Sequence, residues 1–197
     1  MKPQRAARVN GALPLGAALA GAALAVVAGV LAGRGRLVRQ SPGVRDNGSG
    51  VVAALTAAAT SNDSAIGIVI TGAEEFGLVG ARALARERAE LFAGCTVVNL
   101  DTLDETGALR LVSHDGAGRQ LAKEYAARLS RLGLPVGVRR LPLGILVDSL
   151  PLARVGAKAV TIARLDWSTL RRIHTPRDSA EGCSFETAVR IGQAVIS

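Results

Sequence analysis

The chain has 197 residues, enough for one domain with its own core plus an appendage, and 49% of the residues are hydrophobic although only 3% are aromatic. The formal net charge is +8, but seven of the 24 basic residues precede Asp46 and no acidic residue does, so the remainder carries 17 basic against 16 acidic side chains. The larger part of the chain is therefore nearly neutral, which argues against a nucleic-acid partner.

The excess positive charge flanks residues 11–33, a run without any charged side chain. A helix of this length spans roughly 30 Å or more, the thickness of a bilayer core, and basic flanks are typical of membrane segments. We predict a single-pass membrane protein in which residues 1–36 form a basic flank and transmembrane anchor that contacts the lipid bilayer through residues 11–33. A secretory signal peptide is the alternative interpretation. Basic residues on both sides leave the orientation of the domain open.

Residues 37–45 indicate a linker with a turn, and residues 46–197 indicate one folded domain. Apolar runs that alternate with amphipathic stretches predict an α/β sheet covered by helices on both faces. We expect helices at residues 49–59, 77–92, 118–132, 150–155 and 184–196, and strands at residues 65–71, 95–100, 109–112, 136–141 and 158–163.

Three of these predictions concern local detail. Residues 65–71 are rich in β-branched side chains and show no polar face, which is typical of a central strand buried on both sides. Ser184 is expected to be the N-cap of the last helix. Cys95 and Cys183 do not form a CxxC pattern and are expected to be small buried residues.

Four polar fragments stand out: DNGSG from Asp46, the pair Glu74-Glu75, NLD ending at Asp101, and HTPRD from His174. The glutamate pair and Asp101 follow predicted strands, and ligands of such sheets bind at the carboxyl ends of strands. Alone, each fragment is also typical of a turn or a helix cap. Together they supply carboxylate oxygens, one imidazole nitrogen and a spare carboxylate, the set that a zinc hydrolase needs.

The stretches PGVRDNGSGVVAAL, IVITGAEEFGLVGARAL, VVNLD and IHTPRD resemble, in order and approximate spacing, the M28 family of zinc metallopeptidases, which includes aminopeptidases and carboxypeptidases. The resemblance extends from Pro42 to the C-terminus. It implies a three-layer α/β/α sandwich of the zinc-peptidase type and a peptide substrate.

The resemblance also implies roles for single residues. Asp46 would bridge two zinc ions, Glu75 and His174 would complete one zinc site, and Asp101 would belong to the other. Glu74 would be the general base that takes a proton from the attacking water and passes it to the leaving amine.

Two further residues are assigned to substrate binding. Asp148, in GILVDSLPLARVGAKAV, resembles the family's Ser-Asp segment near the substrate pocket, and a surface turn is its alternative. Trp167 lies a few residues before His174 and is expected to wall the pocket, with core packing as the alternative.

The chain departs from the family pattern before Asp46, where an H-x-D motif normally supplies one more histidine ligand. Here the apolar segment and its basic linker occupy that place, and His114, the other histidine of the chain, is expected to lie in a loop. We therefore predict one well-formed zinc site of Asp46, Glu75 and His174, with room for one or two ions. The mixed sheet is expected to be incomplete, with an apolar edge beside residues 65–71.

The resulting hypothesis is a membrane-anchored, zinc-dependent metallopeptidase that acts as an exopeptidase. One alternative is a glutaminyl-cyclase-like enzyme with a single zinc ion, in which Glu74 moves protons and Asp101 donates or accepts hydrogen bonds without binding the ion. A second alternative is a non-catalytic or shortened relative that acts as a binding module.

Overall fold

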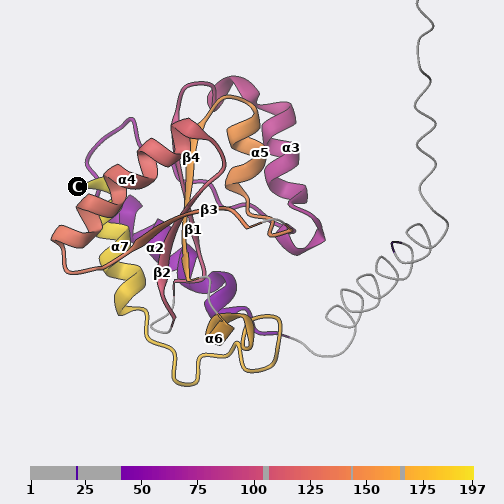
Figure 1. The fold of residues 1–197 in the computed structure, drawn as a ribbon, viewed down its shortest axis with the longest axis vertical. Helices are drawn as coiled ribbons and strands as arrows, with labels where there is room; N and C mark the ends of the chain where they lie inside the picture. Colours follow the sequence, from indigo (N-terminus) through magenta and orange to yellow (C-terminus); the bar gives the residue numbers. More distant parts are fainter. Residues whose placement is uncertain (1–20, 22–40, 104–106, 143, 165–166) are drawn as a thin grey trace, which may run out of the picture. The chain divides into compact units, whose positions relative to one another are not determined.

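The computed structural model describes residue 21 and residues 41–103, 107–142, 144–164 and 167–197. The chain divides into two units, Met1–Arg39 and Gln40–Ser197, and the fold considered below is that of the second (Figure 1). The predicted membrane segment, residues 11–33, lies outside the described residues except for Gly21. Within the described part, no helix has the length and apolarity needed to cross a bilayer.

The second unit is built on a four-stranded mixed sheet with the strand order β1-β4-β2-β3. β1 runs parallel to β4, β4 runs antiparallel to β2, and β2 runs parallel to β3. Since β1 and β4 are parallel, their carboxyl ends meet at one edge of the sheet, with Asp101 opposite Ala163. Four predicted strands are confirmed, each within one residue: β1 (Thr96–Asp101), β2 (Leu109–Ser113), β3 (Gly137–Arg140) and β4 (Lys158–Arg164).

Helices cover both faces of this sheet, as the amphipathic stretches predict (Figure 1). Because side chains alternate along a strand, Val98 of β1 packs into one core and Val97 into the other. The result is the expected α/β/α layering. The first face carries α2 (Gly50–Thr60), α4 (Gly116–Arg131) and α7 (Glu186–Ile196), and the second carries α3 (Val79–Glu87) and α5 (Ser149–Arg154).

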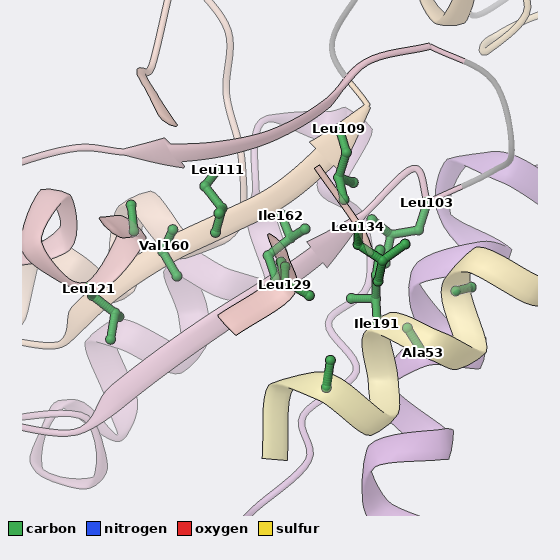
Figure 2. Packing of buried hydrophobic residues seen from close by; sticks show 13 residues of the cluster. Ala53, Leu103, Leu109, Leu111, Leu121, Leu129, Leu134, Val160, Ile162 and Ile191 are labelled. Atoms are coloured by element: carbon green, nitrogen blue, oxygen red, sulfur yellow. The ribbon is translucent and has the colours of Figure 1, made fainter. Parts of the chain in front are cut away.

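The larger core consists of aliphatic side chains, in keeping with the low aromatic content. Figure 2 shows Val160 and Ile162 of β4 among leucines of β2 and α4 and beside Ile191 of α7. All three of these side chains are fully buried. The core therefore fixes β4, and with it the neighbouring strand β1 that carries Asp101.

The clearest departure from prediction concerns residues 65–71, which form no strand in the described structure. Their apolar side chains are exposed, with 53% of Val69 and 60% of Ile70 open to solvent. A run of this composition can be buried on both faces only where a neighbouring strand pairs with it, and these residues join no ladder of the described sheet. The prediction of a central buried strand, and of a sheet edge beside it, is therefore wrong, whereas the predicted mixed α/β sheet is confirmed.

Two smaller predictions are also wrong. The Cys95 side chain is exposed and that of Cys183 is partly exposed, because each residue lies at the end of a turn and not within a strand or helix. The N-cap of the last helix is Phe185, one residue later than the expected Ser184. The Ser184 hydroxyl nevertheless accepts a hydrogen bond from the Glu186 N–H at 3.2 Å.

Candidate metal centre

Three side chains from distant parts of the chain converge beyond the carboxyl end of β1. His174 Nε2 lies 3.1 Å from Asp46 Oδ2 and 2.7 Å from Glu75 Oε1. One ligand atom from each of the three residues lies within 4.8 Å of the other two. The structure thus brings together the three residues that the sequence predicts for one zinc site.

The chemistry of this donor set fits a zinc ion. Bonds of about 2 Å from zinc to nitrogen and oxygen place ligand atoms roughly 3–4 Å apart, close to the separations seen here. Asp46 is 15% exposed, whereas Glu75 and His174 are each 54% exposed, so one side of the group faces solvent. Three protein ligands with an open side are typical of a catalytic zinc site, in which water or substrate takes the fourth position.

The DNGSG turn holds Asp46 through the residue that follows it. Asn47 Oδ1 accepts hydrogen bonds from the N–H groups of Gly50 and Thr102, both at 3.1 Å, and Asn47 Nδ2 donates to the Leu100 carbonyl at 2.9 Å. A Cβ on Gly50 would lie 2.2 Å from the Leu100 oxygen, so only glycine allows this approach. The turn that precedes α2 is therefore fastened to the end of β1, next to Asp101.

The glutamate pair lies in the 3-10 turn η2 (Glu74–Phe76). Ala73 before the turn and Gly77 after it both have positive φ, which reverses the chain and delays the start of α3 to Val79. The two carboxylates still separate: Glu75 reaches His174, and Glu74 is not part of the three-residue ligand group.

Glu74 is surrounded by other carboxylates. Burial and, with smaller effects, nearby negative charges raise the pKa of Glu74 to about 7. These charges belong, in order of their effect, to Glu75, Asp101, Asp148 and Asp46. The predicted base and the predicted ligands therefore share one electrostatic environment.

The neighbouring carboxylates also affect the pKa values of Asp101 and His174. Burial and the Asp46 charge raise the pKa of Asp101 to about 7, although the Thr102 hydroxyl, 2.9 Å away, opposes the shift. Hydrogen bonds to Asp46 and Glu75 raise the pKa of His174 to about 10. Asp101 thus lies beside the ligand group but is not a member of it.

The two residues assigned to substrate binding lie in different surroundings. Asp148 Oδ2 accepts a hydrogen bond from the Thr71 hydroxyl, and Oδ1 is buried without a hydrogen-bond partner among the described residues. Burial raises the pKa of Asp148. Trp167 lies in α6 (Trp167–Leu170) and is 73% exposed, which excludes the core-packing alternative. Its contact with a substrate stays a prediction.

A partly buried row of hydrogen-bonded polar side chains, which includes the neighbour of Asp148, has no counterpart in the sequence-based predictions. His114 lies in the expected loop, between β2 and α4, and its Nε2 is 2.7 Å from the Ser149 hydroxyl. Ser149 in turn lies 2.6 Å from the Thr161 hydroxyl, to which Asn99 Nδ2 donates at 3.3 Å. Polar residues within the otherwise apolar strands β1 and β4 were the available signal.

Comparisons with known proteins bear on the family and the fold of the chain. The sequence profile of peptidase family M28 matches residues 31–197. No curated protein sequence matches the chain.

Several solved structures share the fold. An aminopeptidase from Aneurinibacillus sp. strain AM-1 is 24% identical with a TM-score of 0.61, and the match covers 80% of this chain and 39% of that one. LapA aminopeptidase from Legionella pneumophila is 20% identical with a TM-score of 0.64 over 79% of this chain and 46% of that one. BSAP, a zinc aminopeptidase from Bacillus subtilis, is 22% identical with a TM-score of 0.62 over 81% and 42%. The chain thus spans less than half the length of each of these proteins.

Proposed function

The chain belongs to peptidase family M28, and we propose that it is a zinc-dependent aminopeptidase. The observation that carries this proposal is the convergence of Asp46, Glu75 and His174 on one point, with Glu74 directly beside them in the same turn as Glu75. The structural relatives described above are aminopeptidases, which supports the same reaction class.

Asp46, Glu75 and His174 would hold one zinc ion. When bound, the ion lowers the pKa of water and polarises the carbonyl of the scissile peptide bond. His174 must lose its proton to act as a ligand, and the two carboxylates that hold it in the metal-free protein are the ligands beside which it would bind.

Glu74 would take the proton from the attacking water and deliver it to the leaving amine. Its raised pKa, about 7, describes the metal-free protein. A nearby cation lowers the pKa of a carboxylate, so Glu74 would be ionised at neutral pH and able to accept a proton.

The charge of the site favours a substrate with a free amino terminus. Asp101 and Asp148 add negative charge beside Glu74, and Asp148 Oδ1 is buried without a partner among the described residues. A terminal ammonium group would donate hydrogen bonds to these carboxylates, and its positive charge would balance their negative charge. Trp167 and Phe76, which are 73% and 64% exposed, would then contact an apolar side chain of the substrate.

Substitution of the base and of one ligand tests the proposal. Zinc content by elemental analysis and hydrolysis of aminoacyl p-nitroanilides are measured for the wild type, Glu74→Gln, His174→Ala and the control His114→Gln. We expect about one zinc per chain in all but His174→Ala, and a loss of turnover of about 10²–10⁴-fold in Glu74→Gln.

Each part of this proposal can fail separately. Undiminished turnover in Glu74→Gln would remove Glu74 as the base. Full zinc content in His174→Ala would place the metal elsewhere. A folded wild type that binds no zinc would leave a binding module as the function.

The membrane anchor is a separate proposal that the uncharged run of residues 11–33 supports. Fractionation of cells that express the full chain, followed by carbonate extraction of the membranes, tests it. Recovery of the chain in the extracted supernatant would refute the anchor without bearing on the peptidase.

A further inference from the structure

A fully buried carboxylate lies directly behind the ligand group. Asp178, four residues after His174, has no exposed surface. Its Oδ1 accepts a hydrogen bond from the Arg45 N–H at 2.6 Å, and its Oδ2 accepts one from the Asp46 N–H at 3.2 Å. The Ser41 hydroxyl also donates to Oδ2 at 3.5 Å. We call the segment that follows His174 and contains Asp178 the histidine loop. One side chain of this loop therefore fixes two consecutive peptide N–H groups of the turn that carries Asp46.

The connection is reciprocal, because the Arg45 side chain reaches back to the histidine loop. Arg45 is only 4% exposed. Its NH1 group donates to the carbonyl oxygens of Arg177 at 3.1 Å and Ser179 at 2.7 Å, and NH2 donates to that of Glu181 at 3.2 Å. We call these contacts, together with those of Asp178, the Arg45–Asp178 clamp.

We propose that Asp178 is a positioning residue for the zinc ligand Asp46, and that the clamp sets the distance between Asp46 and His174. This inference rests on the proposed function. Asn47 fastens the turn that carries Asp46 to β1. The contacts of Asp178 and Arg45 fix the orientation of the same turn relative to the histidine loop. These hydrogen bonds fix the peptide planes before Arg45 and before Asp46, and hence the direction in which the Asp46 side chain leaves the backbone.

The chemistry of the clamp makes a specific prediction for zinc affinity. Residues that orient metal ligands from outside the coordination shell typically contribute 10–100-fold to metal affinity. In Asp178→Asn the amide keeps the shape of the carboxylate but sets an N–H group against one of the two backbone N–H groups. We expect the zinc Kd to rise about 10–100-fold in this variant.

The control is Glu181→Gln, which removes one negative charge from the same loop. The Glu181 side chain is exposed, and only its carbonyl oxygen takes part in the clamp. Zinc affinity is measured by competition with a chromophoric chelator, without substrate. The visible absorption spectrum of the Co²⁺-loaded protein reports ligand geometry. Circular dichroism with urea unfolding of the metal-free proteins separates affinity from stability.

A raised zinc Kd and an altered Co²⁺ spectrum in folded Asp178→Asn, with wild-type values in Glu181→Gln, would support the inference. Wild-type affinity and spectrum in folded Asp178→Asn would overturn it. If Asp178→Asn does not fold, Arg45→Lys serves instead, because it keeps the charge and the backbone N–H contact but loses the fork to three carbonyls. Reduced affinity of Arg45→Lys would support the inference, and unchanged affinity would overturn it.

The proposed function fails in a different way. A wild type that binds zinc but hydrolyses no aminoacyl substrate would refute the peptidase, and the comparison of affinities would still decide the role of Asp178. A folded wild type that binds no zinc would overturn both.

Discussion

Gly50, the first residue of α2, lies where the turn that carries Asp46 packs most closely against the end of β1. Its φ of −65° and ψ of −39° are ordinary helical values, so the backbone alone would accept alanine. Intrinsic helix propensity even favours alanine over glycine by about 1 kcal/mol. The Cβ of an alanine, however, would lie 2.1 Å from Asn47 Oδ1 and 2.2 Å from the Leu100 carbonyl oxygen. Helix propensity would stabilise the alanine variant and the steric clash would destabilise it, so the larger of the two effects determines the sign of the change in the free energy of unfolding.

The clash is the larger effect. Carbon–oxygen contacts normally exceed about 3.3 Å, so the Cβ and the two oxygen atoms must move apart by about 1 Å. The Leu100 oxygen belongs to the backbone of β1, which cannot shift without disturbing its pairing with β4. If Asn47 moves instead, its three hydrogen bonds are lost at about 0.5–1.5 kcal/mol each. Less the gain in propensity of about 1 kcal/mol, we expect Gly50→Ala to lower the free energy of unfolding by about 0.5–3.5 kcal/mol.

Gly116→Ala is the matched control. Gly116 is the first residue of α4, and a Cβ there meets no atom within 4 Å. This variant should keep wild-type stability or gain up to about 1 kcal/mol. Urea unfolding of the metal-free proteins, followed by circular dichroism, gives both values. Equal stability of the two variants would refute the close docking of the DNGSG turn on β1.

Two further predictions concern charge and exposure. In the metal-free protein the two histidines should titrate on opposite sides of 6.5, because carboxylates raise the pKa of His174 to about 10 and burial lowers that of His114. The bonds of protonated His174 thus stabilise the metal-free fold fully below pH 6.5, and this contribution is lost as the pH rises towards about 10. NMR titration of the ring protons, assigned with His174→Ala, checks this, and coincident titration near 6.5 would contradict it. Ile70, at 60% exposure, should accept lysine with a change of less than about 0.5 kcal/mol in the free energy of unfolding. By contrast, Ile162→Ala in the core should cost about 2–5 kcal/mol. A loss of that size at Ile70, measured by urea unfolding, would show that residues 65–71 are buried.

The sequence predicts β1 and β4 well and residues 65–71 badly, although all three runs are rich in β-branched side chains. β1 and β4 pair with each other over six residues, so their apolar side chains find cover on both faces. Residues 65–71 have the same composition but no partner in the described sheet. Composition reports how well a segment suits a strand, whereas pairing depends on segments far away in the sequence.

In the metal centre, too, some residues can be predicted from the sequence and others cannot. The ligands Asp46, Glu75 and His174 can be predicted because their motifs resemble those of the M28 family and few side-chain types bind zinc. Asn47 and Asp178 escape prediction because their partners are backbone N–H and carbonyl groups, which every residue carries. Such contacts leave no mark in the sequence beyond a polar residue in a loop.

The backbone itself shows why these contacts are needed. Ala73, Thr102 and His174, three of the four non-glycine residues with positive φ in the described part of the chain, precede, follow or belong to site residues. Each such conformation costs of order 1–3 kcal/mol and persists only where surrounding contacts enforce it. Asn47 holds Thr102 by its N–H, and the Arg45–Asp178 clamp holds the loop that carries His174. The residues that compensate this strain therefore differ from the residues that bind the ion, so substitutions at the two groups should separate folding of the site from its chemistry.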